Sequence, residues 1–503
     1  MSAACPSPSP GHFDLERLPD LAPFREALQR AQFTAPRVAE TLAPQPPLDV
    51  VDLPVLLLLT AEPTPYHTLI RLFFLEQPVL ETDLREALSP MALEPLFDCR
   101  LLRRTREGVR AMVKLLPHDQ FYFVSDFPRR QSHESMPFDH VLGVGGTSST
   151  LAGLTPRHPV KSCLDLCAGG GVQSILASPF ASRVVGTDMN ERALNFARFN
   201  AHLNGIHNIE WRQGSFFEPV AAEQFDLLVA NPPFVISPES SLLYRDGGGK
   251  GDRVSEQVVR GIPQHLAEGG FGVMLLNWHH ADDSDWHVRP LQWVENNGCD
   301  CWLICICRSK PLIYAAHWLR QTDHEDKERY QRLLQQWTRY YKEANIGCIS
   351  FGAVVMRKRS GGPNWTRHDS VQNTQYTGAC GEHIARLFAA EDFVRSLPAE
   401  AALLDHVFSV HPDLVIDHRF SFRDSQCVLQ GLTMELSRGL AFAGRIDGFV
   451  LDFLSYCDGH STLRQAIERL AKKSGTDDAP SLFSHYMEMT RNLVCLGILV
   501  HQA

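Results

Sequence analysis

The middle third of the chain alternates between short apolar runs and longer amphipathic stretches. The apolar runs have the length of buried strands, and the apolar residues of the stretches between them recur at helical spacing. The expected strands are SCLDLCA (162–168), RVVGTDM (183–189), IEWRQG (209–214), FDLLVAN (225–231) and GFGVMLLNW (270–278), and the expected helices are VQSILAS (172–178), ERALNFARFNAHLN (191–204) and SEQVVRGIPQHLAEG (255–269). This alternation predicts an α/β fold with a parallel, doubly wound sheet.

The same sheet is expected to continue beyond residue 280. CDCWLICICR (299–308) and IGCISFGAVVMRKR (346–359) are apolar enough for strands, and the polar stretch 323–344 between them has helical spacing. We expect the second of these strands to close the sheet, so that the α/β domain covers residues 131–362. The segment RKRSGGPNW (357–365) changes composition abruptly and predicts a linker.

Smaller domains are expected before and after the α/β domain in the sequence. Residues 1–20 are rich in Pro and Ser and are predicted to be disordered. Residues 21–130 contain a helical lead-in, three short helices and two alternating segments, VRAMVKLLP (109–117) and QFYFVSDF (120–127), which is a winged-helix-like pattern. Residues 363–503 end in a helix, a turn, a helix and an apolar element, so we expect a second winged-helix-like domain there.

Basic side chains gather at the expected wing of the first of these domains. Winged helices often bind nucleic acid, so this cluster is a candidate RNA contact. A solvated edge on a protein-docking module would have the same composition, and both interpretations stay open. The residues are Arg100, Arg103, Arg104, Arg106, Arg110 and Lys114.

Composition and charge narrow the classes of function. Of the 503 residues, 44% are hydrophobic and 21% are charged, and the formal net charge of −10 excludes attachment to nucleic acid by bulk charge. Thirteen cysteines, without the regular spacing of a small secreted scaffold, predict reduced thiols. The apolar run VLLLL (55–59) is far shorter than the ~20 residues that a bilayer requires. We therefore expect a cytoplasmic protein without a membrane segment.

Two acidic residues and a glycine-rich turn suggest a ligand at one edge of the sheet. The first strand runs into Asp165-Leu166-Cys167-Ala168-Gly169-Gly170-Gly171, and glycine allows backbone to approach a ligand closely. The next strand ends in Asp188, near the spacing at which a carboxylate meets ribose hydroxyls in nucleotide-binding α/β folds. Together they predict a nucleoside cofactor, with Asp165, Ala168, Gly169, Gly171 and Asp188 as binding residues.

The strand FDLLVAN is followed by the tetrapeptide Asn231-Pro232-Pro233-Phe234. The side-chain oxygen of Asn231 can accept a hydrogen bond from a planar NH₂ group, and the rigid prolines present a neighbouring carbonyl. Phe234 offers a face for stacking. We interpret Asn231, Pro232 and Phe234 as catalytic residues that hold an amide or amino nitrogen; the alternative is a turn that merely ends the strand.

These motifs, in this order and spacing, resemble the class I S-adenosylmethionine-dependent methyltransferases. The resemblance covers roughly residues 140–280 and is closest to the amino-methylating group marked by [ND]-P-P-[FYW]. Within that group, NPPFVISPE (231–239), the stretch that follows it to Gly270 and the segment GVGGTSSTLAGL (143–154) resemble the HemK-type release-factor glutamine methyltransferases. The resemblance implies a Rossmann-like sheet, S-adenosylmethionine as cofactor, a role for Asn231 beside the cofactor, and N5-methylation of glutamine in a protein substrate such as a translation factor.

The chain also departs from that family. Gly214-Ser215 stands where the family has Gly-Asp, so Ser215 replaces the residue expected to meet adenine. The aromatic residue of the tetrapeptide is Phe234 where the family usually has Tyr, and RNA base methyltransferases of the same clan also use Phe. Methylation of an rRNA or tRNA base, at adenine N6 or guanine N2, therefore remains an alternative, and a non-catalytic cofactor- or RNA-binding protein is a second one.

Two further groups of residues have a plainer explanation. The cysteines Cys299, Cys301, Cys305 and Cys307 share one parity along a strand, which core packing explains better than a metal site. His279 and His280 follow the strand GFGVMLLNW and would lie near the ligand edge. Isolated histidines are usually satisfied by local hydrogen bonds, so we assign them no function and expect no metal.

Overall fold

The computed structural model describes residues 13, 18–42, 52–128, 136–246, 251–323, 326–371, 376–377, 379–423, 426–440, 442–474 and 479–502. The chain divides into two compact units, one of residues 1–152 and 159–369 and one of residues 153–158 and 370–503. Most of the segment 1–20, predicted to be disordered, lies outside the described residues. Phe13, which lies inside that segment, is buried against the rings of Phe196 and Phe199.

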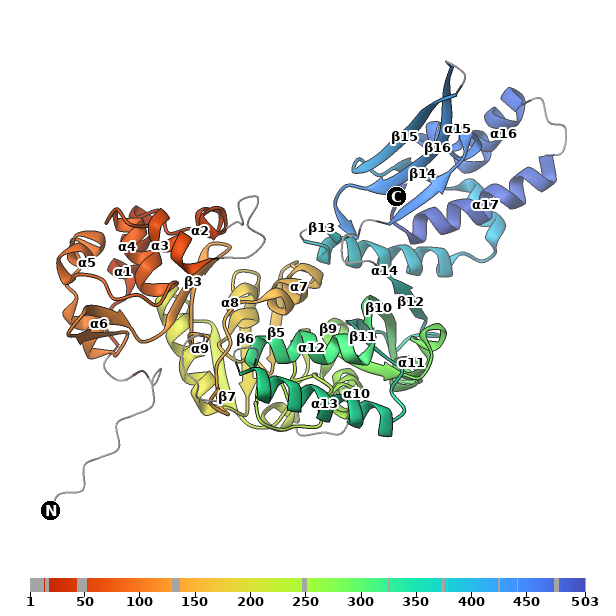
Figure 1. Ribbon diagram of the computed structural model, residues 1–503. Coiled ribbons are helices and arrows are strands. Elements are labelled where there is room, and N and C mark those ends of the chain that lie inside the picture. Colours follow the sequence, from red (N-terminus) through yellow and green to blue (C-terminus); the bar gives the residue numbers. More distant parts are fainter. Residues whose placement is uncertain are drawn as a thin grey trace. The chain divides into compact units, whose positions relative to one another are not determined.

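The first unit contains an eight-stranded sheet in the order β12-β10-β11-β9-β8-β5-β6-β7. Strands β5 to β9 run parallel, and β11 is antiparallel to both β9 and β10. This confirms the predicted Rossmann-like sheet with its parallel half (Figure 1). The strands are β5 (Val160–Leu166), β6 (Ala181–Asp188), β7 (Ile209–Gln213), β8 (Phe225–Ala230), β9 (Leu266–His280), β10 (Cys299–Ser309), β11 (Cys348–Lys358) and β12 (Thr366–Ser370).

The antiparallel part of the sheet differs from the expectation. The strand expected to close the sheet, β11, is inserted between β9 and β10. The edge is formed instead by β12, which begins just after the segment expected to be a linker, and Cys301 N–H donates to the Trp365 carbonyl at 2.9 Å. The sheet therefore extends past residue 362, because an exposed β10 edge would leave backbone groups unpaired.

Helices cover both faces of the sheet. Leu276 and Trp278 of β9 pack in one hydrophobic core with Val258 of α10 and Trp293 of α11. Asn277, between them on the strand, faces the opposite side and contacts Tyr314 of α12. Figure 1 shows α12 and α13 side by side on that second face. The helices are α7 (Gly146–Leu154), α8 (Val172–Ala177), α9 (Glu191–Leu203), α10 (Arg253–Gly261), α11 (Val288–Val294), α12 (Pro311–Thr322) and α13 (Lys327–Glu343).

The cysteines of β10 lie in the protein interior. Cys299, Cys301 and Cys305 belong to the core between the sheet and helices α10 and α11, as core packing predicts. A register shift between Cys305 and Cys307 interrupts the strand, and Cys307 is only half-buried. Within the described ranges, no group of three or more His, Cys, Asp or Glu side chains is placed to hold a metal ion.

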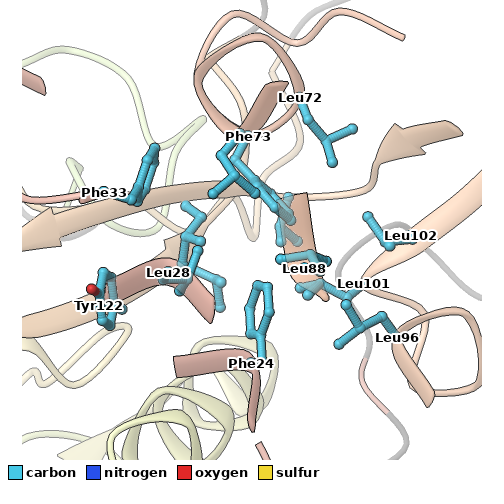
Figure 2. Packing of buried hydrophobic residues seen from close by; sticks show 14 of the residues in the cluster. Phe24, Leu28, Phe33, Leu72, Phe73, Leu88, Leu96, Leu101, Leu102 and Tyr122 are labelled. Atoms are coloured by element: carbon cyan, nitrogen blue, oxygen red, sulfur yellow. The ribbon is translucent and has the colours of Figure 1, made fainter. Parts of the chain in front are cut away.

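The N-terminal part of this unit is a small helical domain with two hairpins. Phe24, Leu28, Phe73 and Leu88 converge from three helices in its core (Figure 2). The elements are α1 (Ala22–Arg30), α2 (Ala35–Leu42), α3 (Leu53–Leu59), α4 (Pro65–Phe73), α5 (Glu81–Leu88), α6 (Glu94–Asp98), β1 (Leu102–Thr105), β2 (Gly108–Ala111), β3 (Lys114–His118) and β4 (Phe121–Ser125).

The expected hairpin of this domain is present, but it is shorter than predicted. Within the segments 109–117 and 120–127, β3 pairs with β4, whereas residues 109–111 belong to β2, which pairs with β1 in a second hairpin. Gly108 begins β2 with a φ of 128°, and a Cβ there would lie 2.4 Å from the Val79 carbonyl oxygen. Only glycine fits, since Val79 forms a bridge with Val109. The winged-helix assignment stays a prediction.

The second unit combines small antiparallel sheets with helices. Two three-stranded sheets have the orders β19-β14-β20 and β15-β16-β18, and β13 pairs with β17 in a two-stranded sheet. Its core includes Phe408, Phe453 and Leu493. The elements are β13 (Tyr376–Thr377), α14 (Gly381–Ser396), β14 (Val407–Val410), β15 (Leu414–Arg423), β16 (Gln426–Leu436), β17 (Gly439–Leu440), β18 (Ala443–Ile446), α15 (Gly448–Tyr456), β19 (Asp458–Thr462), α16 (Leu463–Ser474), α17 (Ala479–Cys495) and β20 (Leu499–Gln502).

Candidate active site

Three segments expected to carry chemistry begin at the same edge of the sheet. Strand β5 lies between β8 and β6, and its last residue, Leu166, is paired with Ala230 of β8 and Thr187 of β6. Leu166, Ala230 and Thr187 thus lie side by side across the sheet. The residue that follows each of them is the first of the glycine-rich turn, Asn231 or Asp188, so all three begin at the same height along the strands. Two strand spacings separate Asn231 from Asp188, a distance of about 10 Å. Nucleoside-sized ligands bind at such an edge in open α/β sheets.

The glycine-rich turn adopts backbone conformations that favour glycine. Gly169 and Gly171 have φ angles of 53° and 81°, in the left-handed region. A Cβ on Gly171 would also lie 2.6 Å from the ring of Trp211. Among the described residues, a Cβ on Gly169 would meet nothing within 4 Å, so the space beside that residue is open. Gly171 thus serves packing, whereas Gly169 leaves room for a ligand. Ala168, between Cys167 and Gly169, is buried.

Asp188 is bonded to the turn from the neighbouring strand. Its two carboxylate oxygens accept hydrogen bonds from Gly169 N–H and Asn190 N–H, each at 2.8 Å. Burial raises the pKa of Asp188 above its ordinary value, and the backbone hydrogen bonds oppose this rise. Asp188 as a whole is only half-buried beside the turn. It can therefore accept further hydrogen bonds from hydroxyl groups of a ligand.

Asp165 occupies a different place from the one expected for a ligand-binding residue. It is 1% exposed, and one of its oxygens accepts hydrogen bonds from both the amide (2.8 Å) and the hydroxyl (2.7 Å) of Ser174 on α8. Burial raises its pKa to about 7, although the bonds from Ser174 act in the opposite direction. Asp165 thus fixes the start of α8, directly after the glycine-rich turn, from inside the protein. The sequence motif alone did not reveal this role.

Asn200 is a residue of this site that the sequence analysis missed. Its side-chain nitrogen donates to the carbonyl oxygens of Gly170 (2.9 Å) and Val124 (3.1 Å), and its oxygen accepts from Val124 N–H at 2.7 Å. It lies inside the expected helix 191–204, where its residue type alone suggests only an exposed polar position. No local pattern marks it, because its partners lie in the turn and in β4.

The clamp, residues Asn231–Phe234, follows the end of β8. The side-chain nitrogen of Asn231 lies 3.5 Å from Thr147 Oγ1 in the first turn of α7, which belongs to the segment 143–154 that resembles the HemK-type enzymes. Gln173 of α8 holds that turn through a 2.8 Å hydrogen bond to the Ser148 carbonyl. The clamp and α8, the helix that follows the glycine-rich turn, are therefore each connected to α7 by a side chain.

Phe234 is less open than a stacking platform requires. It is 6% exposed, and its ring centroid lies 5.8 Å from that of Phe351 on β11. It also forms a β-bridge with Asp246, which closes the clamp loop, residues 235–246. The carboxylate of Asp246 accepts a 2.8 Å hydrogen bond from the Ser237 hydroxyl inside this loop. The Phe234 ring thus packs into the protein interior against β11 and supports the clamp there.

Ser215 lies two residues beyond the end of β7, at the same edge of the sheet. It is half-buried, and its amide N–H donates to Glu218 at 3.3 Å. The preceding Gly214 has a φ of 159°, and a Cβ there would lie 2.5 Å from the ring of Pro219. The turn is therefore tight, and its contact with adenine stays a prediction.

The surroundings of Asp188 fit a nucleoside. Met189, the next residue, is 54% exposed, and Leu142 is 50% exposed. The Leu142 carbonyl oxygen lies 3.9 Å from the position of a Cβ on Gly170, so this apolar residue is beside the turn. Exposed apolar side chains next to a carboxylate match the two parts of a nucleoside, which has flat base faces and polar ribose hydroxyls.

His279 and His280 both have local partners. The His280 ring contacts the Ser350 hydroxyl at 2.8 Å and the Asp282 carbonyl at 2.7 Å. The His279 ring lies 3.7 Å from the carboxylate of Asp252, and burial lowers its pKa. Neither observation requires a role in chemistry.

Two family models match two separate regions of the first unit. A family model described as "Methyltransferase small domain" matches residues 145–282, and a domain of unknown function, DUF7059, matches residues 23–112. A solved structure of a putative methyltransferase from Bacillus halodurans C-125 has 17% sequence identity and a TM-score of 0.29, and covers 43% of this chain and 100% of that one.

Curated relatives match the same region. A release factor glutamine methyltransferase from Aliivibrio fischeri is 41% identical over 134 residues, which are 25% of this chain and 42% of the relative. The chain spans about half the length of the first curated relatives that it matches. A ribosomal protein uL3 glutamine methyltransferase from Bordetella pertussis is 32% identical over 220 residues, which are 39% of this chain and 72% of the relative. The chain therefore belongs to the HemK-type class I methyltransferases, whose cofactor is S-adenosylmethionine.

Proposed function

We propose that this protein transfers a methyl group from S-adenosylmethionine to the side-chain amide nitrogen of a glutamine in a protein substrate. The observation that carries the proposal is the common level at which Asn231, the glycine-rich turn and Asp188 leave their strands. Relatives named release factor glutamine methyltransferase and ribosomal protein uL3 glutamine methyltransferase support the choice of glutamine. A translation factor or ribosomal protein is accordingly the proposed kind of partner.

The residues of the site divide between cofactor and substrate. Asp188 binds the ribose hydroxyls, the backbone around Gly169 lies against the rest of the nucleoside, and Ser215 meets the adenine. Bound S-adenosylmethionine supplies an electrophilic sulfonium methyl group. The side-chain nitrogen of Asn231 faces Thr147, so its oxygen is the end that accepts a hydrogen bond from the substrate amide.

The chain contributes mainly by positioning the reacting groups. Asn231 and the carbonyl of Pro232 accept the two N–H groups of the substrate amide, which directs its lone pair toward the methyl group. Bound S-adenosylmethionine would supply its methyl group to this nitrogen, and the nitrogen would release a proton to water. Alignment of this kind accounts for a large part of the rate in enzymes without a strong base.

Two arginines of the basic cluster, Arg104 on β1 and Arg110 on β2, are paired with carboxylates, which weakens the argument for an RNA substrate. Arg104 pairs with Glu81 at 2.9 Å, and Arg110 pairs with Glu107 at 2.6 Å. Hydrogen bonds from Arg104 and Arg85 lower the pKa of Glu81 to about 2, so this carboxylate stays charged beside the two arginines. Guanidinium groups that are paired in this way attract phosphates less strongly.

Transfer of a radiolabelled methyl group to an extract from cells that lack the protein tests this proposal. We expect label in the protein fraction, as N5-methylglutamine after digestion. Simultaneous replacement of Arg103, Arg104 and Arg106 by Ala should leave that activity nearly unchanged. Label in nucleosides, lost with the three arginines and with rising salt, would establish the RNA alternative; label in neither fraction would establish a non-catalytic protein.

Of the helices that the structure describes, none is both long and apolar enough to cross a bilayer. The cytoplasmic location stays a prediction.

A further inference from the structure

Two tyrosine hydroxyls hold the backbone of Ile236 in the clamp loop. The N–H of Ile236 donates to the hydroxyl oxygen of Tyr314 at 3.1 Å. Its carbonyl accepts a hydrogen bond from the hydroxyl of Tyr341 at 2.8 Å. Ile236 is 0% exposed and lies two residues after Phe234, so both of its backbone groups are fixed close to the clamp.

The tyrosines come from a pair of helices that lies on one face of the sheet. Tyr314 lies on α12 and Tyr341 on α13, and these two helices connect β10 to β11. The two helices contact each other, and the rings of Tyr314 and Tyr341 meet edge to face with centroids 6.4 Å apart. The two helices thus hold the clamp loop through two tyrosine hydroxyl groups, which both bind the backbone of one residue, Ile236.

Both tyrosines are themselves fixed by the protein interior. Asn277 of β9 donates a hydrogen bond to the Tyr314 hydroxyl at 2.5 Å. The ring of Trp337, which is fully buried, packs edge-on against Tyr341 with centroids 6.3 Å apart. Burial raises the pKa of both tyrosines well above the ordinary value, so both hydroxyls keep their protons at neutral pH.

The clamp loop is also closed on itself. Phe234 bridges to Asp246, and Val235 N–H donates to the Arg245 carbonyl at 3.2 Å. These bonds fix the shape of the loop, and the two tyrosines fix its location against the sheet. Asn231 is joined to this closed loop through two prolines, whose fixed φ angles leave little freedom between them.

We propose that Tyr314 and Tyr341 are positioning residues for methyl transfer, which hold Ile236 so that the Asn231 carboxamide faces the methyl donor. Neither hydroxyl contacts the substrate, because each is engaged with the Ile236 peptide. This inference rests on the proposed function. Small displacements of a substrate-orienting group cost a large part of the rate, so a brace of this kind affects kcat before it affects binding.

Removal of the two hydroxyls tests the inference with little change in volume. In Tyr314→Phe, Tyr341→Phe and the double variant, kcat on a glutamine-containing protein substrate should fall, by about 10- to 100-fold in the double variant. The KM for that substrate and the Kd for S-adenosylmethionine should stay within about twofold. Tyr330→Phe is the matched control, because Tyr330 lies on α13 but is not bonded to the clamp loop in the part of the chain that the structure describes.

Hydrogen exchange of the peptide 231–246 gives a second readout that needs no activity. The double variant should exchange faster in this peptide than the wild type, and Tyr330→Phe should not. Unchanged exchange, or a kcat equal to that of the wild type, would overturn the inference. So would parallel losses of Tm, cofactor binding and activity, which indicate a purely structural role. A wild-type protein that transfers no methyl group to glutamine defeats the proposed function, while the exchange rates still decide whether the tyrosines brace the loop.

Discussion

Asn200 and Gly170 are joined by a hydrogen bond of 2.9 Å from the side-chain nitrogen of the asparagine to the backbone carbonyl of the glycine. Because the same carboxamide also pairs with both backbone groups of Val124, it links the glycine-rich turn to strand β4. The N-terminal domain therefore takes part in holding the cofactor turn.

Asn200→Ala should weaken S-adenosylmethionine binding by about 10-fold, the equivalent of about 1.4 kcal/mol, because the turn loses a buried hydrogen bond. Asn204→Ala is the control. Asn204 makes the same pair of bonds to Tyr122 of β4, at 2.9 and 2.7 Å, without contact to the turn. Calorimetry should show an unchanged Kd for that variant. Equal losses in both would mean that the N-terminal domain stabilises the fold without affecting the turn.

Asp188→Ala should weaken cofactor binding by about 10- to 100-fold, since the ribose hydroxyls lose a charged acceptor. The turn would also lose the bond between Gly169 N–H and this carboxylate. Asp188→Asn keeps an oxygen acceptor and should bind with intermediate affinity. An unchanged Kd in the alanine variant would remove Asp188 from the cofactor site.

Asn231→Ala should reduce turnover below detection and leave the Kd for the cofactor nearly unchanged, because the residue holds the substrate amide. Single-turnover measurements at saturating cofactor separate the two effects. Asn231→Asp keeps an acceptor oxygen in the same place and should retain part of the activity. Loss of cofactor affinity equal to the loss of turnover would contradict the assignment of Asn231 to the substrate.

The stability of the protein should depend on pH through Asp165. Burial raises its pKa in the folded state to about 7, above the ordinary value of 3.8, so the folded state binds this proton more tightly than the unfolded chain. Its contribution to stability is therefore complete below pH 3.8 and is lost as the pH rises through about 7. Asp165→Asn removes the titration and keeps an oxygen for Ser174.

The measurement is the change in Tm between about pH 5 and about pH 8. Over this interval the Tm of the wild type should fall further than the Tm of Asp165→Asn. The extra fall should be about 3 °C for each kcal/mol that the titration of Asp165 takes from the free energy of unfolding. Parallel profiles for the two proteins would show that the carboxyl group titrates normally in the folded state.

Local patterns were sufficient for the order of strands and helices between Val160 and His280. Buried strands and amphipathic helices differ in the period of their apolar residues, and this period is a property of neighbouring positions. The same holds for the place of Asn231 and Asp188, because parallel strands bring the residues after their carboxyl ends to one edge.

The sequence by itself thus determined that an α/β sheet carries a glycine-rich turn, Asp188 and the clamp at a single edge. Only the tertiary structure decided that β11 lies inside the sheet, that Asp165 is turned toward Ser174, and that Asn200 and Tyr314 hold the turn and the clamp loop. Their partners are far away in the chain: Asn200 and Val124 are 76 positions apart, and Tyr314 and Ile236 are 78 positions apart. Contacts over such separations depend on how whole elements pack, which no local pattern of polar and apolar residues contains.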